Sequence, residues 1–155
     1  MRKMFLVGYV ILFTVAAPFA ASAQTDAQAQ ATIAAILAQF PNGGPGLADA
    51  IAQAVEADPS LAQAAVAAAQ TANPAQQAAI GSGLAQAAIF FANAGTSEAA
   101  AAGQQIQTAL ASAPAGTLTA FNAGGGAAAL AALVSGSQTL TTNNCVSPNR
   151  PGNGC

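Results

Sequence analysis

The chain has 155 residues, with three basic and five acidic side chains and a formal net charge of −2. Nucleic-acid binding and attraction to anionic lipid both depend on a basic surface, so this charge argues against both functions. A chain of this length is expected to form one small domain.

The first 23 residues have the layout of a secretory signal peptide. Two basic residues precede an apolar run over residues 4–15, Pro18 ends that run, and residues 21–23 form an A-x-A cleavage site. An uncleaved membrane anchor is the alternative, but a membrane-spanning helix needs ~20 apolar residues, more than this run supplies. We therefore predict an exported protein, periplasmic or extracellular, that begins at Gln24 and has no membrane contact after cleavage.

Cleavage changes the charge and the chemistry of the chain. The mature chain keeps one base, Arg150, against five acids, which gives one minus five, or −4. It has no His, Lys, Trp or Tyr. Apart from carboxylates and cysteines, His, Lys and Tyr are the side chains that most general acid–base catalysis uses. We therefore expect that the protein is not an enzyme and has no catalytic residue and no cofactor.

Hydrophobic spacing predicts an all-α domain over residues 24–136, with five to seven short helices stacked as antiparallel hairpins. The first helix is expected over residues 25–40, with a capping box between Thr25 and Gln28. A second helix is expected to begin at Pro45. Its apolar stripe consists of Leu47, Ile51 and Val55.

Two helix starts in the middle of the chain are marked by a capping residue followed by proline. Asp58 is expected to cap a third helix, with Pro59 in its first turn. Asn73 is expected to cap a fourth helix through a capping box with Gln76, and Gly95 is expected to end it. The fourth helix has an apolar stripe at helical spacing, which consists of Ile80, Leu84, Ala88 and Phe91.

Helix start and stop signals in the last part of the chain predict shorter helices. One is expected to begin at Thr96 or Ser97, another at Pro114, and a last one is expected over residues 127–134 and to end at Gly136. The side chains of that last helix expected to face the core are Leu130, Leu133 and Val134. From residue 137 to residue 155, the Thr, Asn, Pro and Gly content indicates an irregular tail.

Cys145 and Cys155 bracket nine turn-rich residues that include Arg150. In an exported protein this arrangement favours a disulfide within the tail. Because both cysteines lie in the tail, the bond is expected to order that loop and not to staple the bundle. Three roles remain open, namely a recognition loop with Arg150 at its tip, a cross-link between chains, and protection of the C-terminus from proteolysis.

The acidic residues and the glycine-rich segments do not form a recognisable catalytic or metal site. Asp49 and Glu56 are two helical turns apart, ~10 Å along the axis, which fits poorly with the ~5–9.5 Å of glycosidase carboxylates. Without histidine or a calcium-loop pattern, no metal site is expected. The glycine-rich segments lack the lysine of a phosphate-binding loop.

Two further features concern similarity within and beyond the chain. Residues 46–50, GLADA, match residues 83–87, GLAQA, at an offset of 37 residues, which is typical of two-helix repeats, although an alanine-rich chain also aligns with itself by composition.

The segment NPAQQAAIGSGLAQAA, residues 73–88, with ADPSLAQAAVAAA at residues 57–69, resembles a group of small exported, alanine-rich bacterial proteins of unknown function. The resemblance implies an exported helical protein and supplies no activity and no functional residues.

The function expected first is a non-enzymatic protein that acts through protein contacts or self-association, with Phe90 and Arg150 as candidate contact residues. Phe90 is one helical step, ~100°, from Phe91 and therefore points away from the apolar stripe. It is either a second core contact or an exposed aromatic side chain that meets a partner. The alternative function is a carrier of a small apolar ligand, with a pocket between helices lined by Ile80, Leu84, Phe90 and Phe91.

Overall fold

The structure is a computed structural model that describes the backbone of residues 20–142 and the side chains of residues 26–135. Within residues 20–142 the chain forms seven helices and no strand, which confirms the predicted all-α bundle. The helices are α1 (Ala20–Gln39), α2 (Pro45–Ala57), α3 (Leu61–Ala69), α4 (Pro74–Ala94), α5 (Ser97–Leu110), α6 (Ala115–Ala123) and α7 (Gly126–Thr142).

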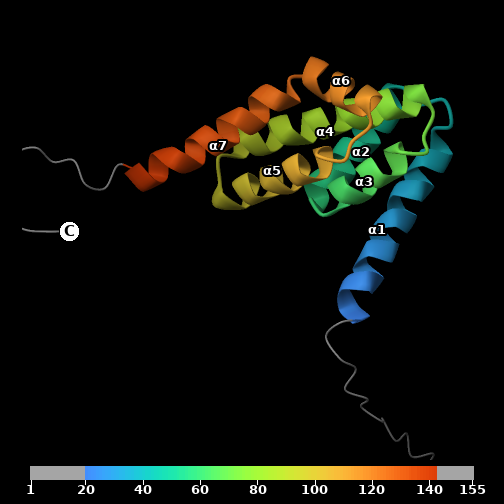
Figure 1. Ribbon diagram of the computed structural model, residues 1–155, viewed down its shortest axis with the longest axis horizontal. Coiled ribbons are helices and arrows are strands. Elements are labelled where there is room, and N and C mark those ends of the chain that lie inside the picture. Colours follow the sequence, from blue (N-terminus) through green and yellow to red (C-terminus); the bar gives the residue numbers. More distant parts are fainter. Residues whose placement is uncertain (1–19, 143–155) are drawn as a thin grey trace, which may run out of the picture.

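Helix α4 is the centre of the bundle (Figure 1). It packs against α2, α6, α7 and α5, and to a smaller extent against α3. Helix α1 packs mainly on α3. In Figure 1, α1 leaves the bundle at one end and α7 extends from the opposite end.

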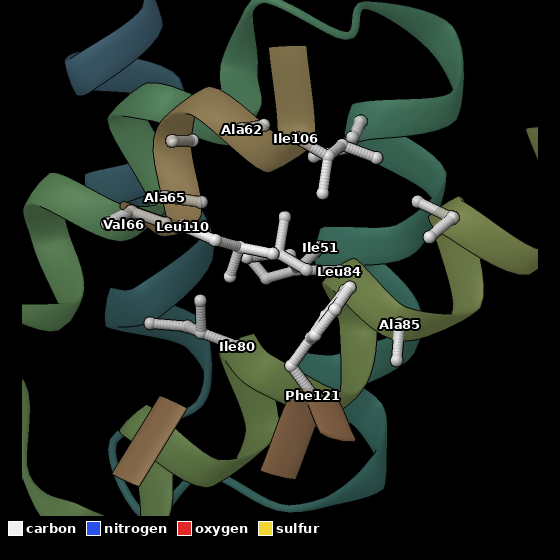
Figure 2. Packing of buried hydrophobic residues seen from close by; sticks show 14 of the residues in the cluster. Ile51, Ala62, Ala65, Val66, Ile80, Leu84, Ala85, Ile106, Leu110 and Phe121 are labelled. Carbon is white, nitrogen blue, oxygen red and sulfur yellow. The ribbon is translucent and has the colours of Figure 1, made fainter. Parts of the chain in front are cut away.

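The core is built from the apolar stripes that the sequence predicts (Figure 2). Ile80 and Leu84 of α4 are fully buried, and so is Ile106 of α5. All three residues of the α2 stripe have no exposed surface. Alanines such as Ala65 and Ala85, also fully buried, fill the space between the larger side chains. Each large apolar side chain contributes ~1.5–3 kcal/mol to the free energy of folding when it is fully buried. Alanine contributes less, because it buries a smaller apolar area.

Two glycines allow other helices to approach α4 closely. A Cβ atom on Gly83 would lie 2.5 Å from the carbonyl oxygen of Ala48 in α2. A Cβ atom on Gly81 would overlap with the carbonyl oxygen of Thr117 in α6. The two glycines are two residues apart, ~200° around the helix, so α2 and α6 pack on nearly opposite sides of α4.

The helix ends predicted around α4 are confirmed. The backbone N–H of Gln76 donates to Asn73 Oδ1 at 2.9 Å, and the backbone N–H of Asn73 donates to Gln76 Oε1 at 3.3 Å. Gly95 ends α4 with a φ of 64°, in the left-handed region that favours glycine. Thr96 then caps α5, because its Oγ1 accepts a hydrogen bond of 3.1 Å from the backbone N–H of Ala99.

Two helix starts differ from the expectation. Helix α1 begins at Ala20, so Thr25 lies inside the helix and does not cap it. Helix α3 begins at Leu61, because Asp58 caps a turn that precedes the helix instead of the helix itself. The backbone N–H and the hydroxyl of Ser60 both donate to Asp58 Oδ1, at 3.0 and 2.7 Å.

The end of α7 also differs from the expectation. The helix continues past Gly136 to Thr142, since a single glycine inside a helix costs only ~1 kcal/mol relative to alanine. Leu130 and Leu133 are buried as predicted, but Val134 is 44% exposed. Val134 is one helical step, ~100°, beyond Leu133, and that step turns it out of the core.

The two segments of the suspected repeat occupy different positions. Residues 46–50 form the first turn of α2, whereas residues 83–87 lie in the middle of α4. In the part of the chain that the structure describes, no single helix is long and apolar enough to cross a membrane. One bent pair, α6 with residues 126–135 at an angle of 72°, passes the same test by its combined length and composition.

Candidate functional site

The structure places Phe90 at the surface of the bundle. Phe90 is 50% exposed and Ile89 is 38% exposed, whereas Phe91 is 7% exposed and belongs to the core. Phe90 is therefore not the second core contact that was one of its two predicted roles. These consecutive apolar residues divide between core and surface because one helix step is ~100°.

Phe90 is held by an aromatic contact from inside the bundle. The ring centroids of Phe90 and Phe91 lie 5.5 Å apart, and the ring planes form an angle of 73°. This edge-to-face arrangement contributes ~0.5–1.5 kcal/mol beyond the buried area. Ile89 lies beside the turn between α6 and α7, because a Cβ atom on Gly125 would be 3.9 Å from Ile89 Cδ1. Phe90 thus contacts the next residue of its own helix, Ile89 lies beside the α6–α7 turn, and the two side chains form an exposed apolar surface.

The exposed side of α4 is narrow and uncharged. Beyond the first turn and before the last residue of the helix, its exposed residues are Ala78, Gln86, Ile89, Phe90 and Asn93, with Ser82 half-buried between them. The sequence of α4 contains no acidic and no basic residue. Removing a charged side chain from water has a high free-energy cost. Because α4 has no charged side chain on this surface, burying it against a partner does not carry that cost.

The side chains expected to line an apolar pocket do not form one. Ile80 and Leu84 have no exposed surface and pack inside the core, while Phe90 is half-exposed on the outside of α4. The expected pocket was therefore wrong in its lining residues. No pocket forms at Ile80 and Leu84 because other buried residues of the core, many of them alanines, pack against these side chains.

A groove of about 730 Å³, lined by polar side chains and alanines, lies between α1, α3 and α5. The polar side chains that line it include Asp26, Gln30, Gln63, Gln104, Gln105 and Thr108. Three helices contribute to this lining, so no spacing within one segment of the sequence could have indicated it. A smaller hollow of about 200 Å³ lies between α5 and α7, and Gln104 lines both.

The described acidic residues do not form a group that could hold a metal ion. Asp49 is exposed on α2, and Asp58 accepts hydrogen bonds from Ser60. Among the described residues, no group of three or more His, Cys, Asp or Glu could hold a metal ion. A hydrogen bond from its own backbone N–H, together with the hydroxyls of Ser97 and Thr96, lowers the pKa of Glu98 below the ordinary 4.5.

Three of the predicted site residues, Cys145, Arg150 and Cys155, lie outside the described part of the chain. Their disulfide and the recognition role of Arg150 stay predictions. Comparisons with protein-family models, with curated proteins and with solved structures find no significant match to this chain.

Proposed function

We propose that this protein is an exported, non-enzymatic contact protein of the cell envelope or the secreted fraction, and that Ile89 and Phe90 form its contact surface. The observation that carries the proposal is the 50% exposure of Phe90 beside an exposed Ile89. Phe, like Tyr and Trp, is enriched in protein–protein interfaces relative to the rest of the surface. The sequence of residues 1–23, with its signal-peptide layout, supports export.

The packing of α4 supports a contact role for this surface. The other sides of α4 are covered by α2, α5, α6 and α7, so the uncharged side with Phe90 is the part of the central helix open to a partner. Phe91 supports the Phe90 ring from below through the edge-to-face contact. An anchor that is already ordered loses less conformational entropy when a partner binds.

The test compares Phe90→Ala with Phe91→Ala in the purified exported protein. Phe90→Ala removes a half-exposed ring, so we expect a loss of about 1 kcal/mol, near the upper value for an aromatic pair, and a midpoint of thermal unfolding lower by about 4 °C. Phe91→Ala removes a core side chain and should cost ~3–5 kcal/mol. Circular dichroism measures both effects.

The functional readout is binding, measured by sedimentation velocity for self-association and by co-purification for another partner. Phe90→Ala should weaken the association at least about tenfold, which corresponds to ~1.4 kcal/mol at a contact of this kind. If the folded Phe90→Ala variant associates as tightly as the unaltered protein, the proposed surface is wrong. The same holds if Phe90→Ala unfolds the bundle as Phe91→Ala is expected to do.

A further inference from the structure

The groove between α1, α3 and α5 presents free hydrogen-bonding groups. The side-chain amides of Gln30, Gln63, Gln104 and Gln105 line it, and none has a hydrogen-bond partner among the described residues. By contrast, the amides of Gln76 and Gln77 donate to backbone carbonyls at helix ends. A carboxamide carries one acceptor and a donor group side by side, which matches the C=O and N–H of a peptide backbone.

The shape and the charge of the groove also limit which ligands it can bind. Alanines of three helices contribute to its surface, among them Ala29, Ala64 and Ala101, and such short side chains allow a backbone to approach closely. Its volume of about 730 Å³ lies within the ~300–1,000 Å³ usual for ligand sites. Asp26 is its one charged lining residue, and residues 26–135 contain no lysine or arginine that could pair with it.

The chain itself contains a segment with the complementary chemistry. Residues 146–154, VSPNRPGNG, have no acidic residue and one base, Arg150, which is the single base of the predicted mature chain. The prolines and glycines of this segment favour an extended or turn backbone, which leaves backbone carbonyls open to the groove amides. An arginine paired with a carboxylate forms the strongest kind of hydrogen bond between side chains.

We propose that the groove between α1, α3 and α5 binds residues 146–154 of a second copy of this chain, with Arg150 paired with Asp26. Figure 1 shows α7, which precedes this segment, extending away from the bundle at the end opposite α1, and this direction favours a second copy as the source of the segment. Arg150 is eight residues after Thr142, so an extended chain would carry it up to ~26 Å from the end of α7, and a bond between Cys145 and Cys155 would shorten that reach. This contact joins unlike surfaces, so it builds rings or open chains of copies.

The inference adds a second contact, away from Ile89 and Phe90, to the proposed contact function, and it rests on self-association being part of that function. Its test is a charge exchange, followed by sedimentation velocity of the exported protein at low and high salt. Asp26→Lys and Arg150→Glu should each lower the association constant at least about tenfold, because each replaces the ion pair with two like charges. The two changes in one chain should restore the association. Asp49→Lys, at an exposed acid outside the groove, is the matched control and should change little.

Mixing the two single variants separates a contact between copies from a contact within one chain. The Asp26→Lys variant keeps its Arg150 and the Arg150→Glu variant keeps its Asp26, so the mixture restores that contact. The two exchanged residues can also pair with each other, as in the double variant, so the mixture should associate with the two variants in alternation. An interaction within one chain would be restored by the double exchange and not by mixing, and that result would overturn the inference. A monomer at every concentration, or no effect of either single variant, would also overturn it.

Failure of this inference can be told apart from failure of the proposed function. If Phe90→Ala abolishes association while both charge changes leave it intact, the contact function stands and the groove is not its site. If the charge changes abolish association and Phe90→Ala does not, the groove is the contact and the surface around Phe90 is not. Raised salt should weaken the Asp26–Arg150 contact more than an apolar contact, which is a second readout.

Discussion

In this protein, glutamine side-chain amides donate hydrogen bonds to backbone carbonyls at helix ends. In other proteins, Lys, Arg and His side chains often form these bonds. None of the helices within residues 20–142 has a basic residue in its last turn. The carbonyl oxygen of Phe40, after α1, accepts from Gln76 Nε2 at 3.2 Å. The carbonyl of Ser112, after α5, accepts from the side-chain amide of Gln70. These bonds satisfy carbonyls that have no partner within their own helix.

The clearest case is Gln77, whose substitution gives the first prediction for single residues. Gln77 Nε2 donates to the carbonyls of Ala69 and Ala72, at 3.1 and 3.2 Å. Gln77→Leu keeps a similar size but removes both bonds. The Ala72 carbonyl loses this side-chain donor, and the Ala69 carbonyl keeps only the 3.3 Å bond from the backbone N–H of Ala72, so we expect a loss of ~1–3 kcal/mol in the free energy of unfolding. Urea unfolding measures it. Gln53→Leu, at an exposed position of α2, is the control and should stay within ~0.5 kcal/mol.

Glu98 gives a prediction on pH at the same scale. Hydrogen bonds from its own backbone N–H, from Ser97 and from Thr96 favour the ionised carboxylate and lower its pKa below 4.5. A lowered folded-state pKa contributes stability that is present above pH 4.5 and is lost as the pH falls through the lower folded value. An NMR titration of Glu98 should therefore give a lower midpoint in the folded chain than in urea. Thr96→Val together with Ser97→Ala should raise the folded midpoint, and equal midpoints in both states would contradict the assignment.

The short helices depend on α4 for their formation. Helices α3 and α6 have nine residues each, whereas isolated helices shorter than ~12–15 residues are marginal in water. Helix α6 is joined to α4 by close packing at Gly81 and by the buried Thr117, whose hydroxyl donates to the carbonyl of Gln77 at 3.2 Å. Their stability therefore comes from packing on α4 more than from helix propensity.

Gly83→Ala tests this dependence of the bundle on close approach to α4. In an isolated helix the change would stabilise by ~0.5–1 kcal/mol. Here the added Cβ would lie 2.5 Å from the Ala48 carbonyl oxygen and 2.9 Å from Ile51 Cβ, so α2 must move away. We expect a net loss of ~1–3 kcal/mol, as for other overpacked cores, measured by thermal or urea unfolding. Ser82→Ala on the same helix is the control, and a stabilised Gly83→Ala variant would contradict the close packing.

The sequence predicts elements well where the deciding chemistry is local. The capping box at Asn73 and the glycine at position 95 depend on neighbouring residues, and both ends of α4 are as expected. The exposure of Phe90 and Val134 depends on which helices pack nearby, and spacing alone left the first open and gave the second wrongly. The groove beside α5 needs side chains from three helices, so no pattern along the chain indicates it.

At the scale of the whole molecule, the folded part has acidic residues and no basic ones. Residues 26–135 contain Asp26, Asp49, Glu56, Asp58 and Glu98 and no lysine or arginine, so no side-chain ion pair can form within them. Burial of apolar side chains and hydrogen bonds at helix ends therefore hold the bundle together. The single base of the predicted mature chain, Arg150, lies beyond the described residues, and the proposed contact between copies uses it as the partner of Asp26.

Reduction of the predicted bond between Cys145 and Cys155 tests whether the tail is independent of its own bundle. Both cysteines lie beyond Thr142, where α7 ends, so the loop that they close includes no residue of the bundle. Closing a loop of about ten residues removes ~2.5–3 kcal/mol of chain entropy, but from the tail and not from the folding equilibrium of the helices. In dilute solution, reduction should add the mass of two hydrogen atoms and leave the midpoint of thermal unfolding nearly unchanged. The variant with both cysteines changed to serine should behave like the reduced protein.

At higher concentration the reduced protein should associate more weakly, because its Arg150 segment is less ordered before it binds. A large fall of the midpoint in dilute solution would mean that the tail packs on its own bundle.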